Sequence, residues 1–194
     1  MKSTRLEAFS DGVIAIIITI MVLELKVPND VTARSLLKLW PVFSSYALSF
    51  VLVAIYWGNH HHLLHLVKKV DGPIIWLNAN LLFWLSLIPF ATAYIGQNYA
   101  APITVAFYAG VQLAGSVSFL ALQLGITRHH DGDPTLIALR AQLTRKNNIA
   151  TVFCAGAIVM AFVYVPLSLA LVMLPALMYF LPERRVEARE VSSE

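Results

Sequence analysis

The segment from residue 5 to residue 20 reads RLEAFSDGVIAIIITI. It places an acid, Asp11, at the start of an apolar run long enough to form a membrane-crossing helix. A charged side chain near hydrocarbon costs roughly 2.5–3.5 kcal/mol on insertion scales, so membrane acids usually face protein or water. Asp11 therefore marks either an ion pathway or a joint between helices.

The composition indicates that the chain lies in a membrane. Of its 194 residues, 58% are hydrophobic and 13% are charged, and the mean hydropathy is +0.70. This is more apolar surface than a soluble domain of that length can bury. We therefore expect an all-α integral membrane protein. The single cysteine, Cys154, excludes an internal disulfide and a cysteine-based metal site.

Polar and helix-breaking residues divide the chain into six apolar stretches, each near or above the roughly 20 residues that a span needs. The predicted helices cover residues 4–25, 35–67, 73–95, 102–127, 135–164 and 165–181. We expect one six-helix transmembrane domain over residues 1–182 and a short cytoplasmic tail over residues 183–194.

Basic residues are unevenly divided between the two sides of the predicted bundle. One side has only Lys26, Arg34 and Lys38, whereas the other has Lys2, Arg5, Lys68, Lys69, Arg128, Arg140, Arg145, Lys146, Arg184, Arg185 and Arg189. The positive-inside rule then places both termini and all six histidines at the cytoplasmic face. This basic excess reflects topology, and we expect no nucleic-acid partner.

The first predicted helix has one apolar stripe. At 100° per residue, Phe9, Gly12, Ile20 and Leu23 lie within about 40° of Ile16, and Thr19 lies about 60° away. Asp11 lies about 140° from Ile16, nearly on the opposite side. Periodicity alone leaves two interpretations open, since the stripe could pack against other helices or face a symmetry axis. In the second case, Asp11 would face neighbouring helices.

These residues closely resemble the first-helix signature of the transmembrane protein 175 family, the potassium channels of endolysosomes and prokaryotes. The matching positions are Arg5, Phe9, Ser10, Asp11, Ile16 and Thr19, together with the histidine-rich end of the second helix and the Leu87–Thr92 run of the third. Animal members carry two six-helix units, whereas this chain holds one. It is therefore similar to the prokaryotic form, a homotetramer of the cell (inner) membrane.

The resemblance implies a potassium-preferring channel whose pore is lined by four copies of the first helix. Ile16 would form the narrowest hydrophobic ring, Ile20 and Leu23 would form further rings, and Thr19 would supply a hydroxyl layer for cation preference. Because apolar rings offer no oxygen to replace water around an ion, we expect modest selectivity for K⁺ over Na⁺. We expect no cofactor, and potassium and related monovalent cations as permeant ions.

The remaining polar residues are interpreted as a joint between helices. The resemblance implies that Phe9, Ser10 and Asp11 belong to a polar network among the first three helices. We expect Arg5 to pair with an acid such as Asp11 or Glu7. Other candidate partners of Asp11 are the histidines of the second helix and Asn78 or Asn80 in the third. The inner-face histidines His61, His62 and His65 are candidates for the network or for pH sensing. Their spacing is not specific for metal, so we predict no metal site.

Two other functional classes remain as alternatives. A proton-coupled secondary transporter would use Asp11 and the histidines as a relay, and it would normally show paired broken helices near the midplane. Only Pro89 interrupts a predicted helix clearly, and it can be accommodated as a kink. A membrane enzyme would need a nucleophile with a base or a metal-activated water, and Ser86, Ser116 and Ser118 have no recognisable partner in the sequence. We therefore expect no enzymatic activity.

Overall fold

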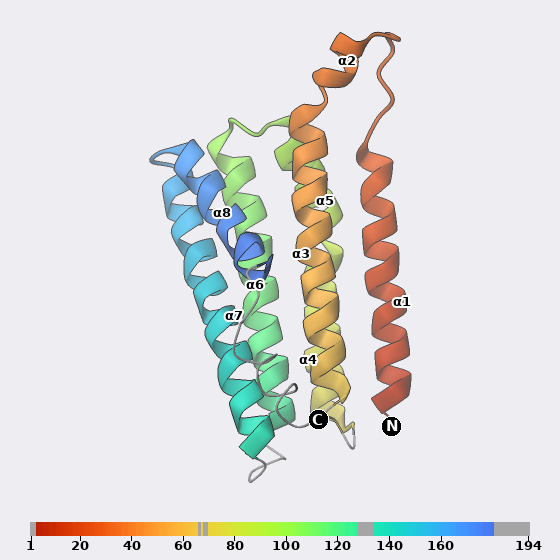
Figure 1. Cartoon of the computed structure of the whole chain (residues 1–194), viewed down its shortest axis with the longest axis vertical. Coiled ribbons are helices and arrows are strands. Elements are labelled where there is room, and N and C mark those ends of the chain that lie inside the picture. The colour runs from red at the N-terminus through yellow and green to blue at the C-terminus, as the bar shows by residue number, and fades with distance from the viewer. Residues whose placement is uncertain (1–2, 66, 68–69, 128–133, 181–194) are drawn as a thin grey trace, which may run out of the picture.

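The structure is a computed structural model that describes residues 3–65, 67, 70–127 and 134–180, without the side chains of 134–143 and 178–180. Within these ranges every regular element is helical, which confirms the predicted all-α class (Figure 1). The elements are α1 (Ser3–Met21), the 3-10 turn η1 (Val22–Glu24), α2 (Ala33–Leu37), α3 (Trp40–His65), α4 (Gly72–Ser86), α5 (Ile88–Gln97), α6 (Pro102–Thr127), α7 (Pro134–Ala161) and α8 (Val165–Phe180). The predicted tail, residues 183–194, lies outside the described residues.

The helices form a bundle with α6 well inside it and α1 at one edge. Helix α6 contacts α4, α5, α7 and α8, whereas α1 contacts α3, α4 and α5. Figure 1 shows α1 standing at the side of the bundle, with α2 projecting beyond the other helices. The position of α1 leaves one of its long faces without a covering helix among the described elements.

Four helical segments of the described chain are long and apolar enough to cross a membrane. They are Ser3–Glu24, Trp40–His65, Gly72–Gln97 and Pro102–Thr127. The other two predicted spans do not meet this standard: Val165–Leu177 is a shorter apolar stretch, and the first half of α7 carries charge. Arg140, Arg145 and Lys146 lower the hydropathy of α7 even though it is 28 residues long.

The prediction of one continuous helix over 35–67 is wrong. A short helix, α2, begins after Thr32, whose side chain accepts a hydrogen bond from the Ser35 backbone N–H in a capping box. A new helix, α3, starts at Trp40. Pro41 explains the break, because proline has no N–H to donate and its ring clashes with the carbonyl four residues earlier. Proline is tolerated in the first turn of a helix, which is where α3 places it.

The predicted helix over 73–95 is also two helices, α4 and α5, joined at Leu87. Pro89 lies in the first turn of α5 and cannot donate to the carbonyl of Leu85. The two helices continue in one direction and together form one candidate span, so the proline interrupts the hydrogen bonding of the segment and not its path. This agrees with the interpretation of Pro89 as a kink.

Close packing of α5 against α3 depends on Gly96. A Cβ at Gly96 would lie 2.6 Å from Ser45 Oγ and 3.0 Å from the Val42 Cα, whereas a Cβ at Gly110 would meet nothing within 4 Å. We expect Gly96→Ala to lower the free energy of unfolding by about 1–3 kcal/mol, because overpacking forces the backbones apart. Gly110→Ala is the control and should be neutral or stabilising by roughly 0.5–1 kcal/mol. Thermal unfolding in detergent micelles compares them, and equal shifts would contradict the steric explanation.

Candidate functional site

Helix α1 has two faces of different character. Its buried face, packed on α3, α4 and α5, consists of Leu6, Ser10, Ile14, Ile17 and Met21. The apolar stripe identified in the sequence is exposed on the other side, where Ile16 is 60% exposed, Ile20 41% and Leu23 73%. Phe9, Gly12 and Thr19 are exposed as well. The stripe therefore does not pack inside the single chain.

Thr19 contributes the hydroxyl group of the exposed face beside Ile16 and Ile20. Its Oγ1–H donates to the Ile16 backbone carbonyl, with 2.9 Å between the oxygens. Because the proton is used within the helix, the oxygen lone pairs remain as acceptors for a water or a cation. The stripe also crosses a change in helix geometry, since α1 ends at Met21 and Leu23 lies in the 3-10 turn η1.

A buried chain of hydrogen bonds joins α3, α4 and α1. His60 Nε2 lies 2.7 Å from Asn78 Oδ1, Asn78 Nδ2 donates to Ser10 Oγ at 2.9 Å, and Ser10 Oγ donates to the Leu6 carbonyl at 2.8 Å. Because the Asn78 amide nitrogen faces Ser10, its oxygen accepts from His60. All three side chains are essentially fully buried. This network fixes the position of α1 against two helices.

Asp11 joins α1 to α3 separately from that network. Its Oδ1 accepts a hydrogen bond from the indole Nε1–H of Trp57 at 2.9 Å. Asp11 thus lies toward a neighbouring helix, but its partner is neither a basic residue, nor a histidine, nor an asparagine, which were the expected classes. The three residues of the Phe-Ser-Asp motif point in different directions, because Phe9 is exposed, Ser10 is buried and Asp11 contacts Trp57.

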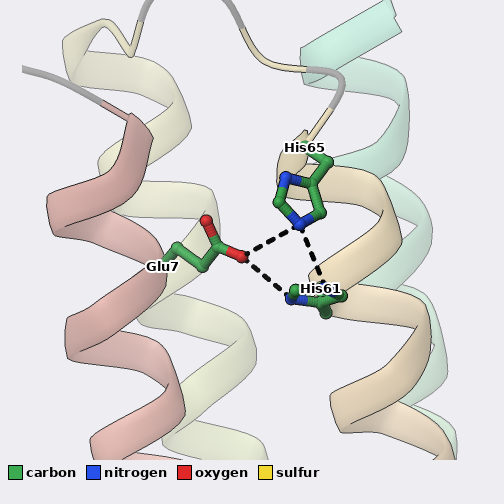
Figure 2. A group of neighbouring side chains, drawn as sticks. All are labelled: Glu7, His61 and His65. Atoms are coloured by element: carbon green, nitrogen blue, oxygen red, sulfur yellow. Dashed lines mark hydrogen bonds and ion pairs between the residues drawn. The ribbon is translucent and has the colours of Figure 1, made fainter.

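A third polar connection lies nearer the N-terminal end of α1. Glu7 Oε1 lies 2.8 Å from His61 Nδ1 and 3.7 Å from His65 Nε2, and the two histidine Nε2 atoms are 3.0 Å apart. Figure 2 shows Glu7 of α1 pointing across to the two histidines, which follow each other on one face of α3. His62 is exposed, and its ring stands edge-on to that of His61.

The expected ion pair of Arg5 is not formed in the structure. Arg5 is exposed on α1, and it makes no ion pair with the residues that the structure describes. The two nearby acids have other partners, because Glu7 contacts the histidines and Asp11 contacts Trp57. Arg5 lies at the end of the exposed stripe, and nothing in the described part of the single chain neutralises it.

Sequence reasoning named Ser10 and Asp11 and offered the histidines of α3 and Asn78 as partners of Asp11, whereas the structure gives Asn78 to His60 and Ser10. It did not predict the contact of Glu7 with the histidines or any role for Trp57. One signal could have found part of it: Glu7 and Ser10 precede and follow Phe9 on the side of α1 away from the stripe, and polar residues there need partners. Which histidine would be buried could not be deduced, because four of them lie within six residues and the rotation of α3 decides.

Long apolar helices, a buried polar joint and an uncovered apolar face on α1 define the chain as a helical membrane protein. A family model described as the endosomal/lysosomal potassium channel TMEM175 matches residues 5–89. A potassium channel of Chryseobacterium sp. (strain P1-3) is 43% identical, over 96% of this chain and 97% of its own. A potassium channel of Streptomyces collinus is 34% identical, over 99% and 98%.

The solved structures include a similar protein. The crystal structure of a lysosomal potassium-selective channel TMEM175 homolog from Chamaesiphon minutus matches with a TM-score of 0.79 and 31% identity. The match covers 91% of this chain and 95% of that one. The chain belongs to the TMEM175 family, and it is a multi-pass membrane protein. The resemblance seen in the first-helix motif is confirmed.

Proposed function

We propose that this protein is a potassium channel whose pore is lined by the exposed stripe of α1 from four copies of the chain. The relatives that span nearly its whole length are named as potassium channels. The observation that carries the assignment of the pore is the exposed apolar face of α1, with Ile16, Ile20 and Leu23 on it. Four such faces around a symmetry axis would enclose a pathway that a single chain cannot form.

A pore with this lining is gated by its wettability. Ile16 would provide four branched aliphatic side chains at one level, and Ile20 and Leu23 would provide further rings toward the other end. A narrow hydrophobic constriction excludes water and therefore ions, and it conducts once it widens. The same rings also impose partial dehydration on a passing ion. Potassium loses its hydration shell at lower cost than sodium, so the constriction favours potassium without a carbonyl filter.

Thr19 supports this selectivity with oxygen atoms. It lies between the levels of Ile16 and Ile20, and its hydroxyl proton is occupied by the Ile16 carbonyl. Its lone pairs are thus available to a dehydrating cation or to a water that accompanies it. Four threonines at one level would form a ring of acceptors beside the constriction. The selectivity from such a ring is modest, because each threonine supplies a single neutral oxygen.

The number of spans and the orientation of the proposed channel are inferred from its helices and its basic residues. We propose six membrane-associated helical segments, with α7 and α8 completing the four longer spans. The uneven distribution of basic residues supports an orientation with both termini in the cytoplasm, in the inner membrane of a prokaryotic cell. The joint formed by Ser10, Asp11 and their partners supports α1 from behind, so that the stripe keeps its direction.

Reconstitution into liposomes tests the proposed function. With potassium on one side, sodium on the other and equal pH on both sides, we expect a reversal potential displaced toward the potassium equilibrium potential. Equal pH removes a proton gradient as a source of current. A current that follows the chloride gradient, or solute uptake driven only by a proton gradient, would contradict the proposal, and the second result would favour a proton-coupled transporter. Protein fixed by a cross-linker before electrophoresis should run as a tetramer.

A further inference from the structure

The group formed by Glu7, His61 and His65 has the composition of a metal site. Each residue offers one ligand atom, and these three atoms lie within 4.8 Å of one another. Of these three residues, only the two histidines stand at a recognisable spacing in the sequence, four residues apart. That spacing alone is not specific for a metal, so no metal site was predicted. The fold adds the carboxylate from another helix, because α1 places Glu7 opposite the histidine face of α3 (Figure 2).

The distances suit a small transition-metal ion. Ligand atoms about 2.0–2.1 Å from a tetrahedral zinc ion are separated from each other by about 3.3 Å. The gap of 3.0 Å between the histidine Nε2 atoms and that of 3.7 Å between Glu7 Oε1 and His65 Nε2 lie on either side of this value. All three ligand atoms lie within 4.8 Å of one another, so rotation of the Glu7 and histidine side chains would bring them around one ion. Two imidazoles and one carboxylate are ligands that divalent transition metals accept.

The group is accessible from one side, and one of its ligands is held in orientation by its neighbours. The Glu7 side chain is 14% exposed, while the side chains of His61 and His65 are 38% and 60% exposed, so the group opens to the solvent side. Three protein ligands leave a position for water. The ring of Trp57 stacks on that of His61 with 6.0 Å between centroids, and Asp11 holds the Trp57 indole. The orientation of His61 is therefore supported from behind, as ligands of metal sites commonly are.

The contact between the two histidines is compatible with exchange of a proton for a metal ion. Two Nε2 atoms at 3.0 Å require one nitrogen to donate a proton and the other to accept it. A divalent ion between them would replace that proton and use both lone pairs. Glu7 would supply negative charge to the same ion. We propose that Glu7, His61 and His65 bind a divalent transition-metal ion of the zinc class and thereby tie α1 to α3.

Metal titration of the purified full chain tests this site. The protein is prepared without a polyhistidine tag and with His129→Ala and His130→Ala, because those two histidines lie outside the described residues and offer competing ligands. Calorimetry with Zn²⁺ and visible absorption with Co²⁺ should show one ion per chain. Glu7→Gln, His61→Ala and His65→Ala should each weaken binding by about 100-fold or more, at or above the upper range for losing a supporting residue. The control His62→Ala replaces an exposed neighbouring histidine and should leave the affinity within about threefold.

His65→Ala keeps the test independent of folding, because its side chain is the most exposed of the three. Absence of Zn²⁺ binding to the unsubstituted site, or unchanged affinity in all three variants, would overturn the proposal. An equal loss in His62→Ala would do so as well, since it would move the site to another histidine. The readouts use no ion flux, so a failure of metal binding and a failure of potassium conduction are separate results.

Discussion

Ile16→Asn is expected to raise the potassium conductance of the reconstituted protein by about tenfold or more and to move the reversal potential toward a non-selective value. The amide offers oxygen and N–H groups where the isoleucine offers only methyl groups, so water and ions enter the constriction more easily. In a tetramer the change occurs four times at one level. A reduction of about 0.35 kcal/mol per side chain sums to about 1.4 kcal/mol, which is about tenfold in rate.

Val117→Asn is the matched control for that experiment. Val117 is 51% exposed in α6, which is also a candidate span, but it lies outside the proposed pore wall. It should leave conductance and selectivity unchanged while introducing the same polar group into an apolar helix. An equal effect in both variants would indicate general damage. An unchanged conductance in Ile16→Asn, in protein that cross-links to the same oligomer as the unsubstituted chain, would exclude Ile16 as the proposed constriction.

Asn78→Leu is expected to lower the free energy of unfolding by about 2–4 kcal/mol, because two buried groups lose a partner and each loss costs about 1–3 kcal/mol. Of the two groups, His60 loses more hydrogen-bonding energy. Its Nδ1 already lacks a hydrogen-bond partner among the described residues, so removal of Asn78 leaves the whole ring unsatisfied. Thermal or denaturant-induced unfolding in detergent micelles measures the difference.

A second substitution separates the network from simple loss of an asparagine. Asn80→Leu removes one hydrogen bond, from Nδ2 to Ser118 Oγ, at a more accessible position of the same helix, and should cost about 1 kcal/mol or less. The double variant His60→Leu with Asn78→Leu should regain part of the loss, because replacing both partners by apolar groups avoids an unpaired polar atom. Strict additivity of the two single changes would contradict the coupling.

The sequence was sufficient for the class of fold and for separating the α1 stripe from Ser10, but periodicity alone left open whether the stripe packs inside the chain. Apolar runs of about 20 residues indicate membrane helices. A period of 3.6 residues is enough to place Ile16 and Ser10 on different sides of the helix. The sequence was not sufficient for the breaks at Pro41 and Pro89, since proline is compatible with either a kinked helix or a new one. The low hydropathy of α7 could have been read from the sequence, because Arg140, Arg145 and Lys146 lie within the predicted helix.

Partners within the joint were harder to predict, for a physical reason. A helix period gives the direction of a side chain relative to its own axis, but the contact with another helix also depends on the rotation and height of that helix. Asp11 was correctly expected to face away from the stripe, yet its partner is an indole. The carboxylate that reaches the histidines is that of Glu7, one turn earlier.

The buried hydrogen bonds from α3 to α1 have a single direction. His60 donates to Asn78, Asn78 donates to Ser10, and Ser10 donates to the Leu6 carbonyl. A proton wire needs groups that can accept a proton on one side and release another on the far side, but a backbone carbonyl has no proton to release and an amide exchanges its own reluctantly. This chain of hydrogen bonds therefore cannot pass a proton from one end to the other. The network fixes the position of α1 without offering protons a path through His60, Asn78 and Ser10.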